Sequence, residues 1–215
     1  MASNISWVDR GLLGVIRRIA APVDVEIALP RSTSSSAPSC PQTPTIWVAD
    51  RGPSLDPAEK RLAMQTEDHP IEYSDFEGVI PAGQYGAGTV MLWDRGTWQP
   101  DNADMDSALE KGEIKFTLHG EKLQGSWVLV RIRGFGKTPI RSAWLLIKHR
   151  DQYASQKDVT QAEPRSVASQ RLLADIARDE GGDVTRAFEG DPAGEARAVA
   201  RATVSEPVAR RGRRL

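Results

Sequence analysis

The chain is poor in the residues that mark secreted, membrane-bound or generally basic proteins. Its single cysteine, Cys40, cannot form a disulfide within the chain and has no base beside it, so we predict a cytoplasmic protein without a catalytic thiol. No apolar run approaches the about 18 residues of a membrane-spanning helix, and the N-terminal residues lack the apolar core of a signal peptide. The formal net charge of −1 excludes a chain that is basic throughout, although a local basic patch remains compatible with it.

Histidine is also scarce, because the chain has three and none of them precedes His69. The glycine-rich segment 83–88, GQYGAG, lacks the Gly-Lys-Ser/Thr ending of a phosphate-binding loop and precedes an apolar strand pattern rather than a helix. We therefore exclude a nucleotide-binding loop there and expect a tight hairpin or a bulge. No motif surrounds His119 or His149, and both are expected to be ordinary surface or core residues.

Short apolar runs separated by turn residues dominate the middle of the chain. Residues 113–119, EIKFTLH, alternate strictly, so Ile114, Phe116 and Leu118 share one face, as in a half-buried strand. Many such runs with glycine-containing turns predict an antiparallel sandwich or barrel. The other predicted strands lie at 25–29, 46–48, 62–66, 89–93, 97–98, 126–133 and 144–148.

Two details of this pattern have alternatives. The sequence Asp-Arg-Gly at 94–96 predicts a turn between two strands. The tryptophans of the strand patterns could stack on nucleic-acid bases, but at such positions we expect most of them in the core. These residues are Trp93, Trp98, Trp127 and Trp144.

The two ends of the chain differ from its middle. Residues 12–19 predict a frayed terminus or a short helix with a basic face, and 31–45 is rich in Ser, Pro and Thr without periodicity. Residues 170–178 predict a helix that Ser169 caps, and the arginines near the C-terminus predict a solvated tail that could also grip phosphates. We divide the chain into a divergent, poorly ordered N-terminal segment, a β domain, and a linker-like helix with a basic tail: 1–45, 46–153 and 154–215.

Residues that suit phosphate chemistry gather between positions 51 and 73. Pro70 favours an extended backbone at His69, and the spacing of four then places His69 and Tyr73 on one face. His69 can supply a proton near neutral pH, and Tyr73 can donate a hydrogen bond to the same oxygens. Arg61 is the natural bidentate phosphate ligand, and Arg51 is a second candidate. From these residues alone, a structural role for His69 is as plausible as a site role.

Several separate blocks, in the same order, resemble the 3′-phosphoesterase domain of bacterial DNA ligase D. Together they extend from about residue 47 to about residue 153. The resemblance implies a compact antiparallel β-barrel with short helices, followed by a flexible or partly helical tail, and an active site in a concave groove. It also implies that His69 and Tyr73 are active-site residues and that Arg61 and Glu67 lie in or beside the site. The matching blocks are 52–57, 60–63, 67–73, 75–88, 118–123 and 144–148.

One part of the resemblance fails. The family carries a metal site of two histidines and an aspartate, in a motif like Leu-His-Tyr-Asp-Phe-Arg-Leu-Glu, before the residue that matches Trp47. This chain has no histidine there, and Asp24 and Glu26 are the only carboxylates between positions 11 and 46. Manganese, which the resemblance implies as cofactor, needs imidazole and carboxylate ligands close together. We therefore assign no metal ligand in this chain.

A shifted reading frame is one hypothesis for the missing motif. Residues 32–37 can be encoded so that the frame one base earlier gives Leu-His-Phe-Glu-Leu-Arg. Sequencing the DNA upstream of the codon for Trp47 tests it, since the hypothesis fails if no alternative frame carries the motif.

Two hypotheses of function follow. The first is a DNA-end-processing enzyme of bacterial non-homologous end joining, which removes 3′ ribonucleotides or phosphates and is associated with an ATP-dependent DNA ligase. The missing metal motif predicts that its activity is impaired. The second is a non-catalytic module that binds DNA 3′ ends, a ligase or an end-binding protein. Either protein is expected to be a monomer without a membrane partner.

Overall fold

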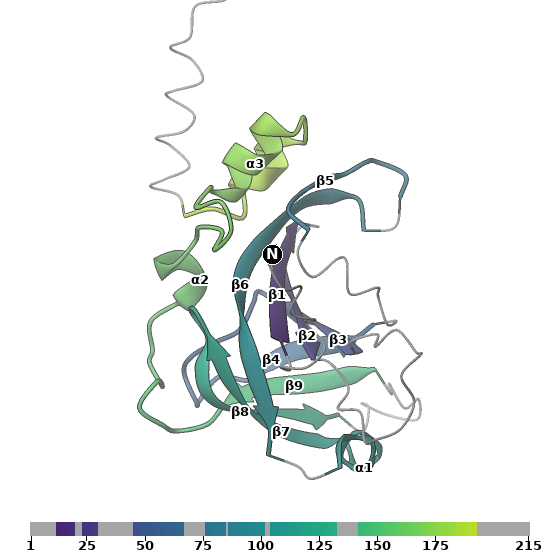
Figure 1. Cartoon of the computed structure of the whole chain (residues 1–215), viewed down its shortest axis with the longest axis vertical. Helices are drawn as coiled ribbons and strands as arrows, with labels where there is room; N and C mark the ends of the chain where they lie inside the picture. The colour runs from purple at the N-terminus through teal and green to yellow at the C-terminus, as the bar shows by residue number, and fades with distance from the viewer. Residues whose placement is uncertain are drawn as a thin grey trace, which may run out of the picture.

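The computed structural model describes residues 12–19, 23–29, 45–66, 76–84, 86–101, 104–132 and 142–192, and for 12–19 and 23–24 only the backbone. Within them, nine antiparallel strands form one sheet in the order β1-β2-β3-β4-β9-β8-β7-β6-β5. β1 also pairs with β6, so the sheet curls back on itself (Figure 1). The strands are β1 (Leu12–Ile19), β2 (Val23–Leu29), β3 (Thr45–Asp50), β4 (Arg61–Gln65), β5 (Gly78–Ile80), β6 (Gly88–Pro100), β7 (Glu113–Gly120), β8 (Gln124–Arg131) and β9 (Ala143–Lys148).

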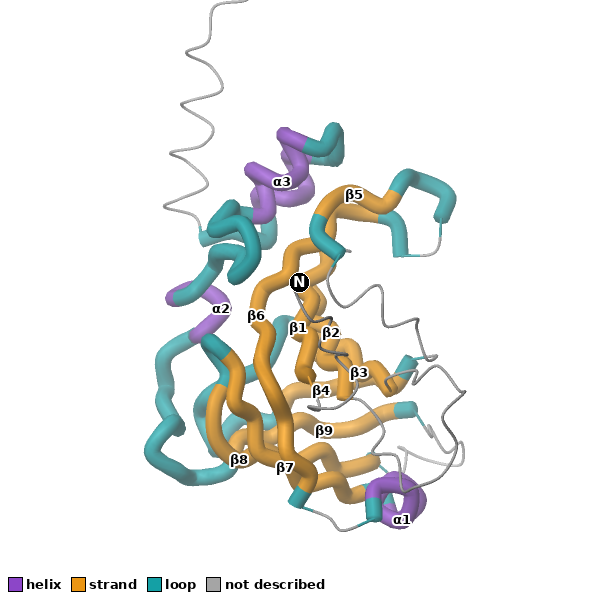
Figure 2. The backbone as a smooth tube through the Cα atoms, viewed as in Figure 1, coloured by secondary structure: helices purple, strands orange, loops and turns teal. Residues whose placement is uncertain are grey.

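The predicted all-β class is confirmed, and Figure 2 shows how strands dominate the described chain. The architecture is one curled sheet rather than a regular barrel, because β6 changes partners along its length. Its start pairs with β5, and its end pairs with β7, while β1 runs along residues 90–97. The pairing of β1 with β6 shifts register between Val15 and Ile16, as at a β-bulge.

Tertiary pairing overrides the local pattern at residues 12–19, where the sequence predicted a short helix or a frayed terminus. This segment is the strand β1, which pairs with β2 on one side and with β6 on the other. The β-branched residues Val15, Ile16 and Ile19 suit a strand that is paired on both sides. β2 confirms the strand predicted at 25–29, so part of the predicted N-terminal segment belongs to the sheet.

The core fills the inside of the curled sheet with large side chains. The alternation predicted for β7 is confirmed, since Ile114, Phe116 and Leu118 are buried. Trp47 and Trp144 meet edge to face, with ring centroids 5.8 Å apart. The other strand tryptophans are buried too, as the sequence predicted, so they are packing residues rather than base-stacking platforms; they are Trp93, Trp98 and Trp127.

The turn predicted at 94–96 does not exist, because β6 continues through it as one strand of 13 residues. Asp94 is fully buried and accepts hydrogen bonds from the backbone N–H groups of Arg95, Lys122 and Leu123, at 2.9–3.0 Å. Gly96 lies so close to β7 that a Cβ would sit 2.3 Å from the carbonyl oxygen of His119. Burial raises the pKa of Asp94, although these N–H groups act against the rise.

We expect Asp94→Ala to lower the free energy of unfolding by about 2–3 kcal/mol, because it leaves buried backbone N–H groups of the β7–β8 hairpin without an acceptor. Urea unfolding followed by tryptophan fluorescence measures this loss. Asp101→Ala is the control, since Asp101 is exposed near the end of the same strand and should change stability by less than about 0.5 kcal/mol. Equal effects of the two substitutions would contradict a structural role for Asp94.

Short helices complete the described chain: α1 (Met105–Lys111), α2 (Val159–Ala162), α3 (Leu173–Asp179) and α4 (Val184–Phe188). Asp104 caps α1 through the N–H groups of the helix's first turn. α3 confirms the predicted C-terminal helix but begins later than expected, and Ser169 does not cap it. Instead, the remote Asp191 accepts from the N–H groups of Leu173 and Ala174. None of the described helices has the length and apolarity to cross a membrane.

Candidate functional site

Two of the predicted phosphate-binding residues lie at the same end of neighbouring strands. β3 and β4 pair antiparallel with Ala49 opposite Ala63. Arg51 directly follows β3 and Arg61 begins β4, so both lie at the same end of this pair of antiparallel strands. The two cations that the sequence proposed as phosphate ligands thus lie at one end of the β3–β4 pair.

Arg61 is largely buried, with a side chain 20% exposed. It shares its face of β4 with Ala63, which packs in the core, while Leu62 points the other way and is exposed. Its Nη2 lies 2.6 Å from a carboxylate oxygen of Glu59. Its Nε is buried and has no hydrogen-bond partner in the described structure. A buried guanidinium donor without an acceptor is costly, so this side chain can gain from a ligand that supplies one.

Arg51 is held in a backbone conformation that non-glycine residues seldom adopt. Its φ is 60°, at the third position of a turn closed by a hydrogen bond from Gly52 N to Ala49 O at 3.1 Å. The next residue, Gly52, has no room for a side chain, because a Cβ there would lie 2.9 Å from a methyl carbon of Thr160. The turn projects Arg51 into solvent with a side chain 71% exposed, 3.8 Å from a carboxylate oxygen of Asp50.

The other predicted site residues, His69, Tyr73 and Glu67, lie outside the described residues, and their site roles stay predictions. The described chain leaves β4 at Gln65, and Thr66 N donates to the carbonyl of Ile46 at 3.0 Å. Of the two other histidines, His119 is exposed, and Nδ1 of His149 shares a hydrogen bond with Oγ of Ser126 at 2.8 Å.

The core-facing side chains of β2, the strand before β3, do not suit a manganese site. β2 pairs with β3, with Ile27 opposite Trp47. Its alternate side chains Val25, Ile27 and Leu29 are buried in the hydrophobic core. These groups offer no nitrogen or oxygen ligand. Across all described residues, no three His, Cys, Asp or Glu side chains lie close enough together to hold a metal ion.

An ion pair with a buried lysine lies at the end of β9, and the sequence did not predict it. Lys148 is fully buried, and its Nζ contacts Oδ2 of Asp151 at 2.5 Å and the carbonyl oxygens of Ser126 and His149 at 3.2 Å. Asp151 also accepts from the backbone N–H groups of Ser126 and Tyr153, at 2.8 and 2.9 Å. The only sequence signal was a lysine at an inward position of an apolar strand. With every lysine donor directed at a protein oxygen, the pair is structural.

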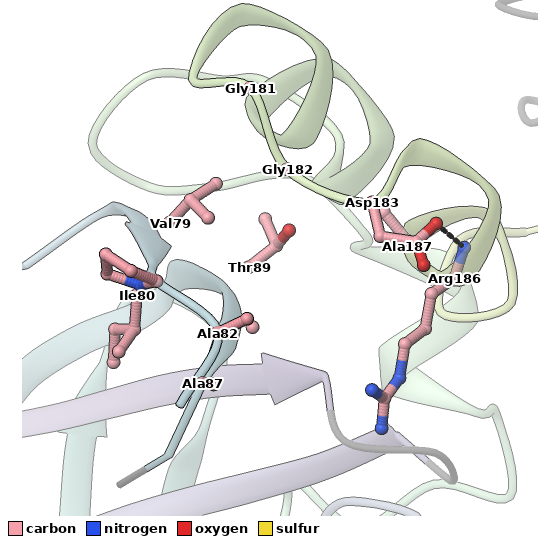
Figure 3. A pocket seen from close by; sticks show the side chains of 12 residues that line it. Val79, Ile80, Ala82, Ala87, Thr89, Gly181, Gly182, Asp183, Arg186 and Ala187 are labelled. Atoms are coloured by element: carbon pink, nitrogen blue, oxygen red, sulfur yellow. Dashed lines mark hydrogen bonds between the residues drawn. The ribbon is translucent and has the colours of Figure 1, made fainter. Parts of the chain in front are cut away.

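A pocket of about 330 Å³ lies between the β5–β6 hairpin and the turn from α3 to α4 (Figure 3). Gly182 permits the close approach of these elements, because a Cβ there would lie 2.8 Å from Val79 and 3.0 Å from the hydroxyl of Thr89. Asp183 faces the pocket and caps α4 through the backbone N–H of Arg186, at 3.0 Å. Neither Arg51 nor Arg61 lines this pocket, so it is separate from the candidate phosphate site.

Comparisons with known proteins agree with the resemblance found in the sequence. Residues 40–131 match the family model described as the DNA ligase D 3′-phosphoesterase domain. The multifunctional non-homologous end joining protein LigD of Pseudomonas aeruginosa is 51% identical over 130 residues, which cover 59% of this chain and 15% of that protein. Its namesake from Mycolicibacterium smegmatis is 42% identical over 100 residues, covering 44% of this chain and 12% of that protein. The chain thus spans less than a fifth of the length of either relative.

Proposed function

On the premise that residues 40–131 are similar to the DNA ligase D 3′-phosphoesterase domain, we propose that this chain recognises DNA 3′ ends in bacterial end joining. In this proposal Arg61 and Arg51 bind the oxygens of a 3′ phosphate or of a 3′ ribonucleotide's phosphodiester. The names of the relatives, which refer to non-homologous end joining, support the pathway. We further propose a cytoplasmic monomer that acts beside a ligase.

The observation that carries this proposal is the unsatisfied guanidinium of Arg61. A planar guanidinium offers two parallel N–H groups to a phosphate, and charge-assisted hydrogen bonds of this kind are strong. The donor at Nε lacks an acceptor in the described structure, and the neighbouring Arg51 adds a second cation. Together they favour a dianionic group, such as a terminal phosphate, over a neutral 3′ hydroxyl.

Two further residues have roles in the proposed chemistry. His69 donates a proton to the leaving oxygen as the phosphate ester breaks, and Tyr73 donates a hydrogen bond to a phosphoryl oxygen. Arg61 keeps the phosphoryl group in place and offsets its charge. The attacking water must be activated by another group, and the apolar core face of β2 offers none.

The apolar core face of β2 makes slow chemistry part of the proposal. A chain that binds the phosphate but cannot activate water is expected to retain DNA-end binding and to lose most of its turnover. The second candidate function, a non-catalytic module that holds DNA ends or docks onto a ligase, is favoured by the same observation. The difference between the two candidates is therefore turnover rather than recognition.

One experiment separates the candidates. The purified chain is titrated with manganese by calorimetry, and release of phosphate from a 3′-phosphate-ended primer–template is followed in parallel. We expect weak or absent manganese binding and slow release, with preferential binding of the 3′-phosphate end. Stoichiometric manganese binding with rapid release would contradict the impairment. His69→Ala should abolish any release without changing the unfolding curve, and a fully active His69→Ala protein would overturn the role of His69.

A further inference from the structure

Each of the two arginines of the candidate phosphate site has a carboxylate beside it. Glu59 holds Nη2 of Arg61 at 2.6 Å, and Asp50 lies 3.8 Å from Nε of Arg51. The first contact is close and the second is loose. The positive charge of Arg61, the more buried of the two arginines, is therefore already compensated within the protein.

The contact with Glu59 uses only part of what the guanidinium offers. Nε and Nη2 form the side-on edge of an arginine, which binds two oxygens of one carboxylate or phosphate. Glu59 contacts Nη2, while Nε on the same edge is buried without a partner in the described structure. Glu59 thus binds one of the two N–H groups on this edge and leaves the other without an acceptor.

Glu59 itself is free to leave. Its side chain is 49% exposed, so its carboxylate exchanges Arg61 for water at little cost, as is usual for ion pairs near the surface. Its backbone N–H is anchored in a turn, where it donates to the carbonyl of Asp56 at 3.0 Å. The side chain can therefore swing away while the backbone of the turn stays in place.

From this geometry we propose that Glu59 is an internal competitor of the 3′ phosphate: it occupies Arg61 in the free protein and is displaced when the phosphate binds. The inference rests on the proposed function of Arg61. A phosphate has the oxygens to reach both Nε and Nη2, whereas Glu59 reaches one of them. The exchange lets the arginine select a doubly charged end and keeps it from binding weaker anions.

The test measures the ratio of affinities for 3′-phosphate and 3′-hydroxyl primer–templates by fluorescence anisotropy. Glu59→Gln should raise this ratio about two- to fivefold, the size expected from removing a partly exposed ion pair. Glu113→Gln is the matched control: it removes the same charge from an exposed pair with Lys115 on β7, three strands away in the sheet, and should leave the ratio unchanged. The double variant Glu59→Gln/Arg61→Ala should lose the increase.

The outcomes distinguish the inference from the function on which it rests. If the wild-type chain binds both ends equally and Arg61→Ala changes nothing, the proposed function fails. If the wild-type chain prefers the phosphate through Arg61 but Glu59→Gln lowers the ratio or leaves it unchanged, the competitor role is overturned. In the case of a lowered ratio, Glu59 positions Arg61 instead. An equal rise in Glu113→Gln would assign the effect to net charge and also overturn the inference.

Discussion

Asp151→Ala is expected to lower the free energy of unfolding by about 3–5 kcal/mol, because it leaves a buried ammonium group without its counter-charge. Lys148 has no exposed surface on its side chain, and its other contacts are neutral carbonyl oxygens. The substitution also removes the acceptor of the Ser126 and Tyr153 N–H groups. Chemical unfolding of the two proteins measures the difference.

The partner substitution should have a smaller effect. Lys148→Met removes the buried charge itself, and the carboxylate of Asp151 keeps its two backbone donors and is 23% exposed to water. We expect it to cost less than Asp151→Ala, and the double variant to be more stable than Asp151→Ala alone. A double variant as unstable as the sum of the two single ones would show that the pair is not coupled.

The same pair predicts a dependence of stability on pH. Burial acts to raise the pKa of Asp151, but the hydrogen bonds from Lys148, Ser126 and Tyr153 outweigh it and hold the pKa below its ordinary value of 3.8. An acid with a lowered pKa in the folded state stabilises the fold above the unfolded pKa, and the contribution disappears as the pH falls through the folded value. Wild type should therefore lose stability below about pH 4, and Asp151→Ala should lack that part of the loss.

Arg61→Ala is expected to weaken binding to a 3′-phosphate-ended primer–template by about 10- to 100-fold, since hydrogen bonds between charged groups contribute about 1.5–3 kcal/mol. Binding to a 3′-hydroxyl end should change much less, because that end has no terminal phosphate for Arg61 to contact. Anisotropy titrations with both ends give the two affinities.

A matched control excludes a general charge effect on DNA binding. Arg95→Ala also removes one positive charge, from a half-exposed pair with Glu121 at 2.9 Å on another part of the sheet. This substitution should weaken binding to both DNA ends slightly and by the same factor. If Arg61→Ala behaves like Arg95→Ala, Arg61 is not the phosphate ligand, and the proposed function loses the observation that carries it.

The amino-acid pattern alone was enough to locate strands in the middle of the chain. β7 lies where its alternation placed it, because a period of two records burial directly, and β8 and β9 lie where their apolar runs were predicted. The sequence blocks around Arg61 were enough to predict the similarity to the DNA ligase D 3′-phosphoesterase domain, whose family model matches residues 40–131. Arg51 and Arg61 also could be named from their chemistry before their neighbouring positions were known.

Other features depended on partners far away in the chain. Asp-Arg-Gly at 94–96 has the composition of a turn, yet Asp94 accepts from the N–H groups of Lys122 and Leu123 and β6 continues through it. Asp191 caps α3 from beyond its C-terminus, and β1 becomes a strand by pairing on both sides. The hydrogen bond from the backbone N–H of Ser126 to Asp151 has the same origin. A sequence pattern records the average environment of a side chain, whereas a hydrogen bond or ion pair depends on which atom the fold places within about 3 Å of it.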